Sequence, residues 1–394
     1  MRTLKTMVAW LALTGTLLAV PDEVYVAYTS GNDSTGDGTS GTPWKTIQKA
    51  LDTADHGGDG LRINVKASET QVLATNALST TTYVATNGAG AASEPLIIQG
   101  YTSAAGDGGI GTIEGTTNSL AIWTGTDTDQ QDYVQLRDLS MTGGQGSGYA
   151  VVLDNYCAVD NCTIVSPFGG IDIDVGSVTN CTITWDSLWA VAGSASVGVY
   201  DCKIILADGN IRDCIFAANA IGNLLDLRTG TTDAARVAIQ LASSAVSNTC
   251  SNNTIIAAIA SGASGADAIY SDAPSSRIQN NYIHGFGATG SAAIELAAAA
   301  ANSSLRGNAC YSCTAGITNG ALGTVGQTSM SNLAGSGVTN AGTGDFTPTS
   351  YLIDAGYPTA IGGISHYPTI GAITTEHTGG TNTIDPLSNT IPGL

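Results

Sequence analysis

Short runs of alternating apolar and polar residues, separated by Gly, Asn, Asp and Ser, recur along most of the chain. Tyr149–Leu153 and Gly170–Val175 are two examples, and both are bounded by residues typical of tight turns. Alternation with a period of two predicts short β-strands that turn one face inward. Helical periodicity is almost absent from this part of the sequence, so the pattern favours an all-β structure.

A six-residue motif recurs within this pattern. The clearest copy is VDNCTI at Val159–Ile164, and VTNCTI at Val178–Ile183 is the next copy along the chain. We interpret each copy as a short strand. Further copies lie at Val199–Ile204, Ile211–Phe216, Cys250–Ile255, Ile278–Ile283 and Leu305–Cys310, the last three with Asn in place of the motif's Cys. Self-similarity of this kind, with several copies about 20 to 28 residues apart, is typical of stacked supersecondary units.

The repeats predict a right-handed parallel β-helix in which each coil contributes two or three short parallel strands. Equivalent residues of successive coils then stack about 4.8 Å apart. The fourth residue of each copy forms one internal ladder in this interpretation: Cys162, Cys181, Cys202, Cys214, Asn253, Asn281 and Asn308. Small, soft thiols suit a narrow interior, so we expect the four cysteines to be reduced rather than disulfide-bonded.

Two spacings depart from this scheme. Val199 and Ile211 lie too close together in the sequence for a full coil, so we expect one of those copies to lie on another strand of the same coil. Ile211 and Cys250 lie farther apart than any other successive copies, which predicts either an inserted loop or an unrecognised strand. We take residues 228–240 as the candidate loop.

The two ends of the coil region carry further signals. From Tyr25 the sequence predicts a strand, then a turn rich in Gly, Asp and Ser, then a short amphipathic helix that starts at Thr46. Ile47, Ala50 and Leu51 form the apolar side of this helix. A helix of this kind can cover the open end of a β-helix and protect its unpaired edge.

This N-terminal stretch resembles the opening of the pectate-lyase-like superfamily of right-handed β-helix proteins. The matching residues are Gly31, Asp33, Gly38, Thr39, Pro43, Thr46, Ile47, Ala50 and Leu51. Asp345–Pro348, Tyr351–Gly356 and Tyr367–Ala372 resemble the closing segments of exported members. The resemblance spans about residues 24–372 and implies a fold rather than a function, because the superfamily includes polysaccharide lyases, glycoside hydrolases, phage tailspikes and non-enzymatic surface proteins.

The N-terminal residues 1–23 fit two interpretations. Arg2 and Lys5 precede an apolar stretch at Met7–Ala19, which is the layout of a secretory signal peptide. The alternative is a retained apolar segment that packs over the end of the fold. The stretch is too short to predict a membrane span. We divide the rest into strand and capping helix (24–60), coils (61–340), closing segment (341–372) and a polar tail (373–394).

Charge narrows the range of functions. The chain carries 13 basic and 32 acidic residues, for a net charge of −19, and only 11% of its 394 residues are charged. So few basic residues cannot easily form the cationic face that nucleic-acid binding requires. A strongly acidic protein also repels anionic substrates. Hydrophobic residues make up 43% of the chain in a regular pattern, which excludes general disorder.

No catalytic residues are predicted. Lyases of the superfamily need a basic residue as proton acceptor and further cations, but only Lys203 and Arg212 lie close together, and we expect both to be surface charges. Hydrolases need two or three carboxylates on one face. Asp172 and Asp174 share a strand face, which we interpret as a solvated outer face. Glu295 and His284 are isolated.

Candidate binding residues are few. Trp185, Trp189 and Tyr200 either form a stacking surface for glycans or pack beneath a loop. Asp33 and Asp37 either hold Ca²⁺ or cap a turn, and no other cofactor is predicted. The CxxC at residues 310–313 lacks a second CxxC or a nearby His in sequence, which argues against zinc.

These observations favour a structural or binding β-helix protein displayed on a virion or cell surface. The expected partners are surface glycans or neighbouring virion subunits, with a homotrimer as one arrangement, and neither nucleic acid nor a membrane span is expected. An exported polysaccharide lyase or glycoside hydrolase is the alternative, because of the signal-like start and the two family-like ends. A non-specific adhesin or matrix protein is a third hypothesis.

Overall fold

The computed structural model describes residues 22–53, 60–73, 77–79, 91, 95–115, 123–124, 132–143, 148–186, 189–207, 209–210, 213–231, 237–242, 248–259, 266–319, 330–333, 336, 338–340 and 345–348. The predicted signal-like segment, the family-like segments at Tyr351 and Tyr367, and the polar tail lie outside these residues. The chain divides into two compact units. The N-terminal unit comprises residues 1–207 and 212–217, and the C-terminal unit comprises residues 208–211 and 218–394.

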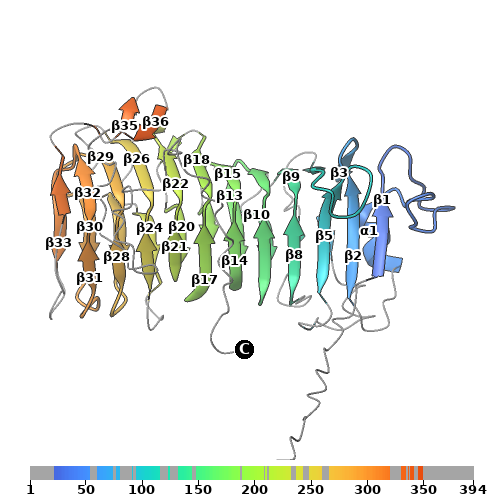
Figure 1. The fold of residues 1–394 in the computed structure, drawn as a ribbon, viewed down its shortest axis with the longest axis horizontal. Helices are drawn as coiled ribbons and strands as arrows, with labels where there is room; N and C mark the ends of the chain where they lie inside the picture. The colour runs from blue at the N-terminus through green and yellow to red at the C-terminus, as the bar shows by residue number, and fades with distance from the viewer. Residues whose placement is uncertain are drawn as a thin grey trace, which may run out of the picture. The chain divides into compact units, whose positions relative to one another are not determined.

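Parallel strands of the N-terminal unit return in turn to three sheets (Figure 1). The first sheet contains β1 (Asp22–Val26), β2 (Leu61–Lys66), β5 (Leu96–Tyr101), β8 (Val134–Arg137), β11 (Cys157–Asp160), β14 (Val175–Thr179) and β17 (Ser196–Tyr200). The second contains β3 (Thr70–Leu73), β6 (Gly111–Gly115), β9 (Leu139–Thr142), β12 (Thr163–Val165), β15 (Thr182–Trp185) and β18 (Lys203–Leu206). The third contains β4 (Leu78–Ser79), β7 (Trp123–Thr124), β10 (Tyr149–Leu153), β13 (Gly169–Ile173), β16 (Val191–Ala192) and β20 (Ile215–Ala217).

The C-terminal unit repeats the same plan. Its first sheet contains β21 (Asn219–Ile221), β25 (Thr249–Ser251), β28 (Arg277–Gln279) and β31 (Ser304–Arg306). Its second contains β22 (Leu224–Leu227), β26 (Thr254–Ile259), β29 (Tyr282–Phe286), β32 (Asn308–Tyr311) and β34 (Met330–Asn332). Its third contains β24 (Val237–Leu241), β27 (Asp267–Ser271), β30 (Ala292–Leu296) and β33 (Ala315–Asn319), and two short strands, β19 (Gly209–Asn210) and β23 (Gly230–Thr231), pair outside these sheets.

The recurring motif is a bend between two sheets. In its clearest copy, β11 ends at Asp160, Asn161 adopts a φ of 51°, and β12 begins at Thr163. Asn180 and Asp201 adopt φ values of 54° and 53° at the same place in the next two coils. Asn and Asp tolerate the left-handed region better than other residues with side chains. The interpretation of these copies as single strands is therefore wrong, because each joins a strand of the first sheet to a strand of the second.

The residue after the bend points inward and forms the predicted ladder, with one correction. Cys162, Cys181 and Cys202 are buried directly before β12, β15 and β18. Cys214 is also buried, but it precedes β20 of the third sheet, where Ile215 pairs with Val191. The prediction that Cys214 belongs to the ladder is therefore wrong, and the short spacing reflects another strand of the same coil, as expected.

In the C-terminal unit the ladder consists of asparagines and includes one residue that the sequence analysis missed. Asn223 lies directly before β22 and is fully buried, like Asn253, Asn281 and Asn308. The long gap in the repeat therefore contains an unrecognised strand, β22. Residues 228–240 are not simply a loop, because they include β23 and the start of β24 at Val237.

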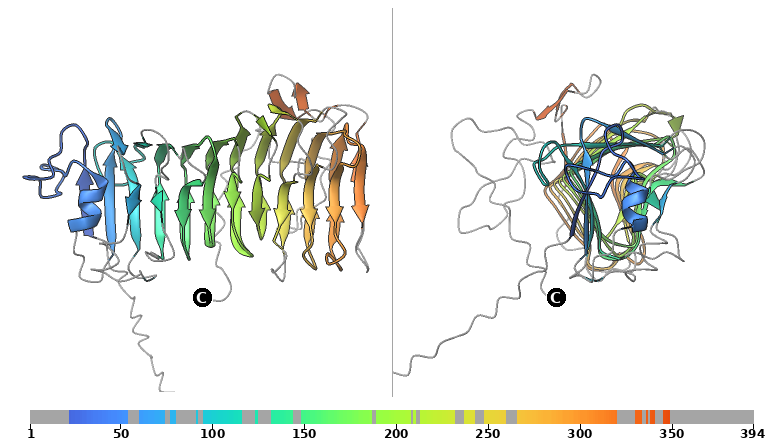
Figure 2. Two further views of the ribbon diagram at one scale, coloured as in Figure 1. Left: turned by 180° about the vertical axis from the view of Figure 1, so that it is seen from behind. Right: turned by 90° about the vertical axis from the view of Figure 1, so that its right-hand side faces the viewer.

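The predicted N-terminal helix is confirmed as α1 (Ile47–Thr53), which lies next to β1 (Figure 2). Its apolar side is Ile47, Ala50 and Leu51, all buried. The hydroxyl of Thr46 accepts the N–H of Lys49 at 3.1 Å and caps the first turn. The helix contacts β1 and β2 of the first sheet and β4 of the third.

A hairpin that spans the predicted boundary between the coils (61–340) and the closing segment (341–372) lies beside the coils of the C-terminal unit. β35 (Val338–Asn340) and β36 (Asp345–Pro348) pair antiparallel. Val338 and Phe346 pack against Ile256, Tyr282 and Ala309 of the second sheet, next to which Figure 1 shows the hairpin. The hairpin therefore covers part of the outer face of this sheet.

Candidate functional site

The three aromatic residues predicted to form one glycan surface lie in different surroundings. Trp185 is fully buried at the end of β15 and cannot stack on a ligand. Trp189 packs against Phe216, with ring centroids 5.6 Å apart. Tyr200 lies across Gly198 of its own strand on the outer face of the first sheet. The structure therefore supports the alternative of local packing for Trp185 and does not bring the three residues together.

The carboxylates of Asp33 and Asp37 hold the N-terminal turn together. Asp33 accepts the N–H groups of Lys45 and Thr46 at 2.8 and 3.0 Å, together with the Thr46 hydroxyl. Asp37 accepts the hydroxyl of Thr42 and the N–H of Thr39, and these hydrogen bonds lower its pKa to about 2. This geometry is that of the capped turn, the second interpretation of these residues. No group of three or more potential metal ligands occurs among the described residues.

Asp172 and Asp174 lie on the third sheet and the corner that follows it. Asp172 is half-buried on β13, and burial together with the charge of Asp174 raises its pKa to about 6. The pKa of Tyr149 rises to about 12 through burial and the charge of Asp172. Lys203 is exposed on β18, as predicted for a surface charge, and Arg212 lies outside the described residues. Asp172 and Asp174 thus give the third sheet and the corner that follows it an excess of negative charge.

The structure reveals a pair of stacked tyrosines in the N-terminal unit that the sequence analysis missed. The rings of Tyr133 and Tyr156 are nearly parallel, with an interplanar angle of 12° and centroids 4.9 Å apart. Each tyrosine directly precedes a strand of the first sheet, β8 or β11, and the backbone N–H of Tyr133 donates to Asn155 at 3.0 Å. We call Tyr133 and Tyr156 the tyrosine ladder.

The tyrosine ladder is exposed and conformationally unusual. Tyr156 is 53% exposed, one of three large apolar residues with high exposure in the described part of the chain. Tyr133 and Tyr156 adopt φ values of 60° and 59°. The other nine described non-glycine residues with positive φ are Asn, Asp or Ser. Bulky residues are rare in this region, so the two tyrosines occupy positions that their backbone preference does not explain.

Polar residues lie next to the two tyrosines in the sequence and in the coil that follows. Oδ1 of Asp132 accepts both the backbone N–H and the side-chain amide of Asn155, at 3.3 and 3.2 Å. The same amide donates to Asp154 at 2.8 Å. Asp174 follows in the next coil, where its backbone N–H donates to Leu153 at 3.4 Å. We call Asp132, Asp154, Asn155 and Asp174 the polar rim.

A pattern in the sequence could have located this site. QDYV at residues 131–134 and DNYC at 154–157 both place a Tyr after an Asp or Asn, directly before a strand. The strands β8 and β11 pair with the same offset that separates these two segments, since Gln135 aligns with Ala158. Without the strand register, the sequence does not indicate that the two tyrosines are neighbours in space.

The C-terminal unit brings together two carboxyl groups that also seemed unrelated. Asp267 begins β27 and Glu295 lies on the neighbouring strand β30. Oδ1 of Asp267 accepts the N–H of Ala292 at 2.8 Å. Burial and a hydrogen bond to the Glu295 carboxyl group raise the pKa of Asp267 to about 7. Glu295 is therefore not isolated, and one of the two groups holds a proton at mildly acidic pH.

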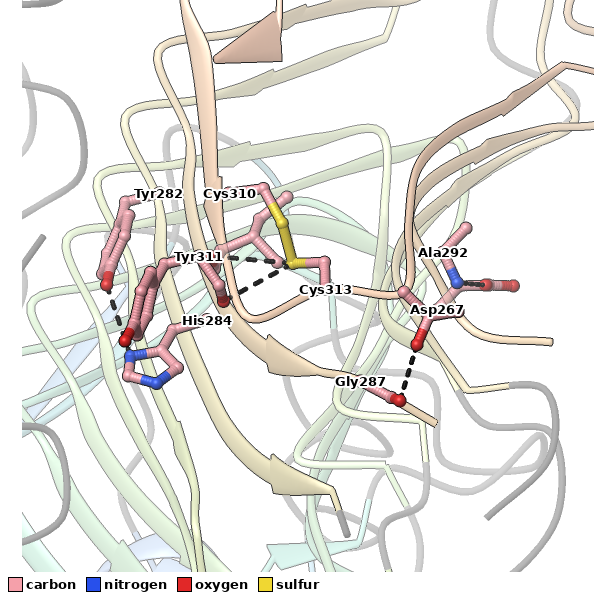
Figure 3. The surroundings of a disulfide bond; sticks show 10 residues. Asp267, Tyr282, His284, Gly287, Ala292, Cys310, Tyr311 and Cys313 are labelled. Carbon is pink, nitrogen blue, oxygen red and sulfur yellow. Dashed lines mark hydrogen bonds between the residues drawn. A yellow bond between two sulfur atoms is a disulfide. The ribbon is translucent and has the colours of Figure 1, made fainter. Parts of the chain in front are cut away.

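The two cysteines of the CxxC are joined in a disulfide, Cys310–Cys313, at the end of β32 (Figure 3). His284, isolated in the sequence, is half-buried on β29 beside Tyr311, with ring centroids 5.1 Å apart. Its Nδ1 lies 3.3 Å from the Tyr282 hydroxyl. Burial lowers the pKa of His284, so the ring packs as a neutral aromatic group.

The fold places the protein in the class of right-handed parallel β-helix proteins, as predicted, because three sheets of parallel strands carry its coils. It is similar to the crystal structure of pectate lyase Pel9A, with a TM-score of 0.54 and 14% identity over 90% of this chain and 96% of that one. The lacto-N-biosidase of Eubacterium ramulus gives a TM-score of 0.40 with 14% identity over 78% of this chain and 67% of that chain.

No family model matches the sequence, and no curated protein matches it. The likeness to pectate lyase Pel9A is at the level of the fold. Among the described residues, no helix is long and apolar enough to cross a membrane.

Proposed function

We propose that the protein is a glycan-binding β-helix protein that acts at a virion or cell surface, and that the tyrosine ladder is its glycan platform. The observation that carries the proposal is the exposure of Tyr156 in a stacked pair held at positive φ. A tyrosine in the left-handed region costs about 1–2 kcal/mol relative to its preferred conformations. A residue that lowers stability while it exposes an aromatic ring is typical of a functional position.

The geometry of the site suits sugar recognition. Aromatic rings stack on the apolar C–H face of a pyranose, while Asp and Asn side chains beside them accept and donate hydrogen bonds to hydroxyl groups. The tyrosine ladder supplies the first element, and Asp132 and Asn155 supply the second. Because the coils repeat along one axis, several sugar units of an extended chain can contact successive coils.

The decisive variant is Tyr156→Asn. Asn tolerates positive φ, so the variant removes the ring without introducing backbone strain. We expect glycan binding to fall by about tenfold or more, equivalent to about 1.4 kcal/mol, while the free energy of unfolding stays equal or rises. Binding is measured by glycan array and by isothermal titration calorimetry with the best ligand, and stability by urea unfolding.

Val165→Asn is the matched control, because Val165 is 39% exposed in the same unit but lies on the second sheet. Its binding should equal that of the unchanged protein. Equal binding by Tyr156→Asn and the unchanged protein would exclude the tyrosine ladder as the platform. Absence of any glycan ligand that depends on Tyr133 or Tyr156 would overturn the proposed function itself.

A second candidate function, hydrolysis of glycosidic bonds, is favoured by the Asp267–Glu295 pair. One protonated and one ionised carboxyl group are the pair that glycoside hydrolysis requires. If the pair is catalytic, Asp267→Asn and Glu295→Gln each abolish the release of reducing ends from a bound glycan, whereas Asp172→Asn retains it. Retained release in both carboxyl variants would exclude this role.

A further inference from the structure

The tyrosine ladder and its polar rim also define the charge of the ligand. We infer that the site binds glycans that carry free ammonium groups, such as polymers of glucosamine, in preference to N-acetylated or uronate-containing glycans. This inference rests on the proposed function, because it concerns the same site. It goes beyond that function by naming the chemical class of the sugar.

The first argument is the charge of the surrounding coils. Residues 132–207 contain eight Asp and no Glu, against two basic residues, Arg137 and Lys203. Arg137 lies at the far end of β8 from Tyr133, and Lys203 lies on the second sheet. The basic residues therefore lie away from the tyrosine ladder, and the field at the site attracts cations and repels carboxylates.

The second argument is the position of the carboxylates around the rings. Strand pairing aligns Gln135 with Ala158 and Cys157 with Gly176, so Asp132, Asn155 and Asp174 occupy equivalent places in three successive coils. Each of them directly precedes the residue at the ladder position, which is Tyr133, Tyr156 or Val175. Asp132 and Asp174 thus lie on either side of the central coil, and Tyr156 lies in that coil.

The third argument is the chemistry of the rings themselves. The negative face of an aromatic ring attracts an ammonium group, and this attraction adds to charge-assisted hydrogen bonds from the ammonium to carboxylates. Tyr156 exposes its ring beside the coil that carries Asp174. An aromatic face bordered by carboxylates is complementary to a protonated amino sugar. A uronate would place its carboxylate against like charges, and an N-acetyl group would remove the cation.

The negative charge near this corner also acts on a neighbouring carboxyl group. The charge of Asp174 contributes, after burial, to the raised pKa of Asp172. A cationic ligand at the polar rim would relieve this repulsion. Ligand binding and ionisation of Asp172 would then favour each other.

The experiment compares three oligosaccharides of equal length by calorimetry at mildly acidic pH: fully deacetylated glucosamine oligomers, their N-acetylated counterparts and oligogalacturonate. We expect the deacetylated oligomer to bind about tenfold more tightly than the N-acetylated one, a difference of about 1.4 kcal/mol. Oligogalacturonate should not bind. The preference should weaken as salt is raised, because exposed charges are screened.

Two variants test the assignment to this site. Asp174→Asn should reduce the preference for the deacetylated oligomer several-fold while binding of the N-acetylated oligomer stays unchanged. Asp201→Asn removes the same charge from the bend before β18, where Asn is tolerated at the observed φ of 53°, and should leave the preference intact. Equal effects of the two variants would overturn the inference, because they would indicate attraction by net charge alone.

The inference and the proposed function fail in distinguishable ways. Equal affinity for deacetylated and N-acetylated oligomers, abolished by Tyr156→Asn, would overturn the preference for ammonium groups and leave glycan binding in place. Binding of oligogalacturonate in preference to the other two would also overturn the inference. Absence of binding to all three oligosaccharides would overturn the inference, and the proposed function would also fall if the glycan array found no ligand that depends on Tyr133 or Tyr156.

Discussion

The same bend of the coil carries thiols in the N-terminal unit and amides in the C-terminal unit. Cys202 Sγ lies 3.6 Å from the carbonyl oxygen of Val178 in the preceding coil. Asn253 Nδ2 lies 2.8 Å from the corresponding carbonyl oxygen, that of Ala220. The two side chains therefore contact equivalent backbone carbonyls. The amide lies at the distance of a full hydrogen bond, whereas the thiol is a weak donor at a longer distance.

The difference extends to how successive coils are connected. Oδ1 of Asn281 accepts the backbone N–H and the side-chain amide of Asn253, at 3.0 and 2.9 Å. Oδ1 of Asn308 accepts the same two groups of Asn281. Each asparagine thus links its coil to the next, and a continuous buried network results. The thiols of the cysteine ladder also interact from coil to coil, Cys181 with Cys162 and Cys202, but as weak donors and acceptors they link the coils less strongly than the amides do.

Among the substitutions that test the comparison of the two ladders, we expect the largest loss of stability at Asn281. Asn281→Ala removes the acceptor of the Asn253 backbone N–H, one of the acceptors of the Asn253 side-chain amide, and the amide donor to the carbonyl of Cys250. Buried groups left unsatisfied cost about 1–3 kcal/mol each, so we expect the free energy of unfolding to fall by about 3–5 kcal/mol. Urea unfolding followed by circular dichroism measures this loss.

Thr289→Ala is a suitable control, because Thr289 is exposed in a turn of the same unit. Its unfolding midpoint should match that of the unchanged protein. Hydrogen exchange should show faster opening at the strands β26 and β29 in Asn281→Ala. A loss below about 1 kcal/mol, the net worth of one ordinary hydrogen bond, would show that the asparagine network contributes no more than the cysteines.

The disulfide gives the next largest effect. Cys310 and Cys313 are joined in a disulfide, whereas six buried cysteines form none: Cys157, Cys162, Cys181, Cys202, Cys214 and Cys250. Replacement of both Cys310 and Cys313 by Ser reopens a very short loop. The chain-entropy model then gives a loss of about 2 kcal/mol.

Intact mass tests the oxidation states directly. Alkylation of the denatured, unreduced protein should modify six cysteines, and prior reduction should make all eight reactive. In the native state, burial raises the pKa of Cys157 to about 12 and that of Cys250 further, so neither should react at neutral pH. Eight modified cysteines without reduction would contradict the assigned disulfide.

A smaller effect is expected in the cysteine ladder. Cys181→Ala removes one buried sulfur and a weak contact to the carbonyl oxygen of Val159, at 3.6 Å. Loss of this volume should cost about 1 kcal/mol, well below the cost of Asn281→Ala. The same urea titration measures both. A cost for Cys181→Ala that equals the cost for Asn281→Ala would remove the distinction between the two ladders.

The sequence allowed the coils, the internal ladder and the capping helix to be predicted because each has a local signature. The dipeptides at Asn161–Cys162 and Asn180–Cys181 mark a bend and an inward position in every copy. The same local signature misled the analysis at Cys214, because the dipeptide alone does not reveal to which sheet a bend leads. Sheet assignment depends on the number of residues in the preceding strands and loops.

The candidate sites were less predictable, because each depends on register between coils. Tyr133 meets Tyr156 only when the strands that follow them, β8 and β11, are aligned, and Asp267 meets Glu295 only across the neighbouring strands β27 and β30. Trp185 and Trp189 are close in sequence but not in surroundings, because the chain leaves the second sheet after Trp185. Proximity in sequence was therefore a poor guide to proximity on the outer face.

The smallest predicted effect is a pH dependence that appears in both units. Asp172 has a pKa of about 6 and Asp267 a pKa of about 7 in the folded state, both above the ordinary value of an aspartate. The folded state therefore binds protons that the unfolded state has already released. Stability contributed by these groups is present below about pH 4 and is lost as the pH rises through 6 for Asp172 and through 7 for Asp267.

The two carboxyl groups can be separated by substitution. Asp172→Asn should remove the part of the stability loss between pH 4 and 6, and Asp267→Asn the part that extends to pH 7, as followed by urea midpoints across this range. Asp172 is only half-buried, so the change in midpoint for Asp172→Asn should be smaller than that for Cys181→Ala. A stability that rises with pH through this window in the unchanged protein, and is unaffected by either substitution, would show that neither carboxyl group is protonated in the folded state at pH 5. In that case Asp267 would be ionised, and the pair would lose the proton on which its role in hydrolysis depends.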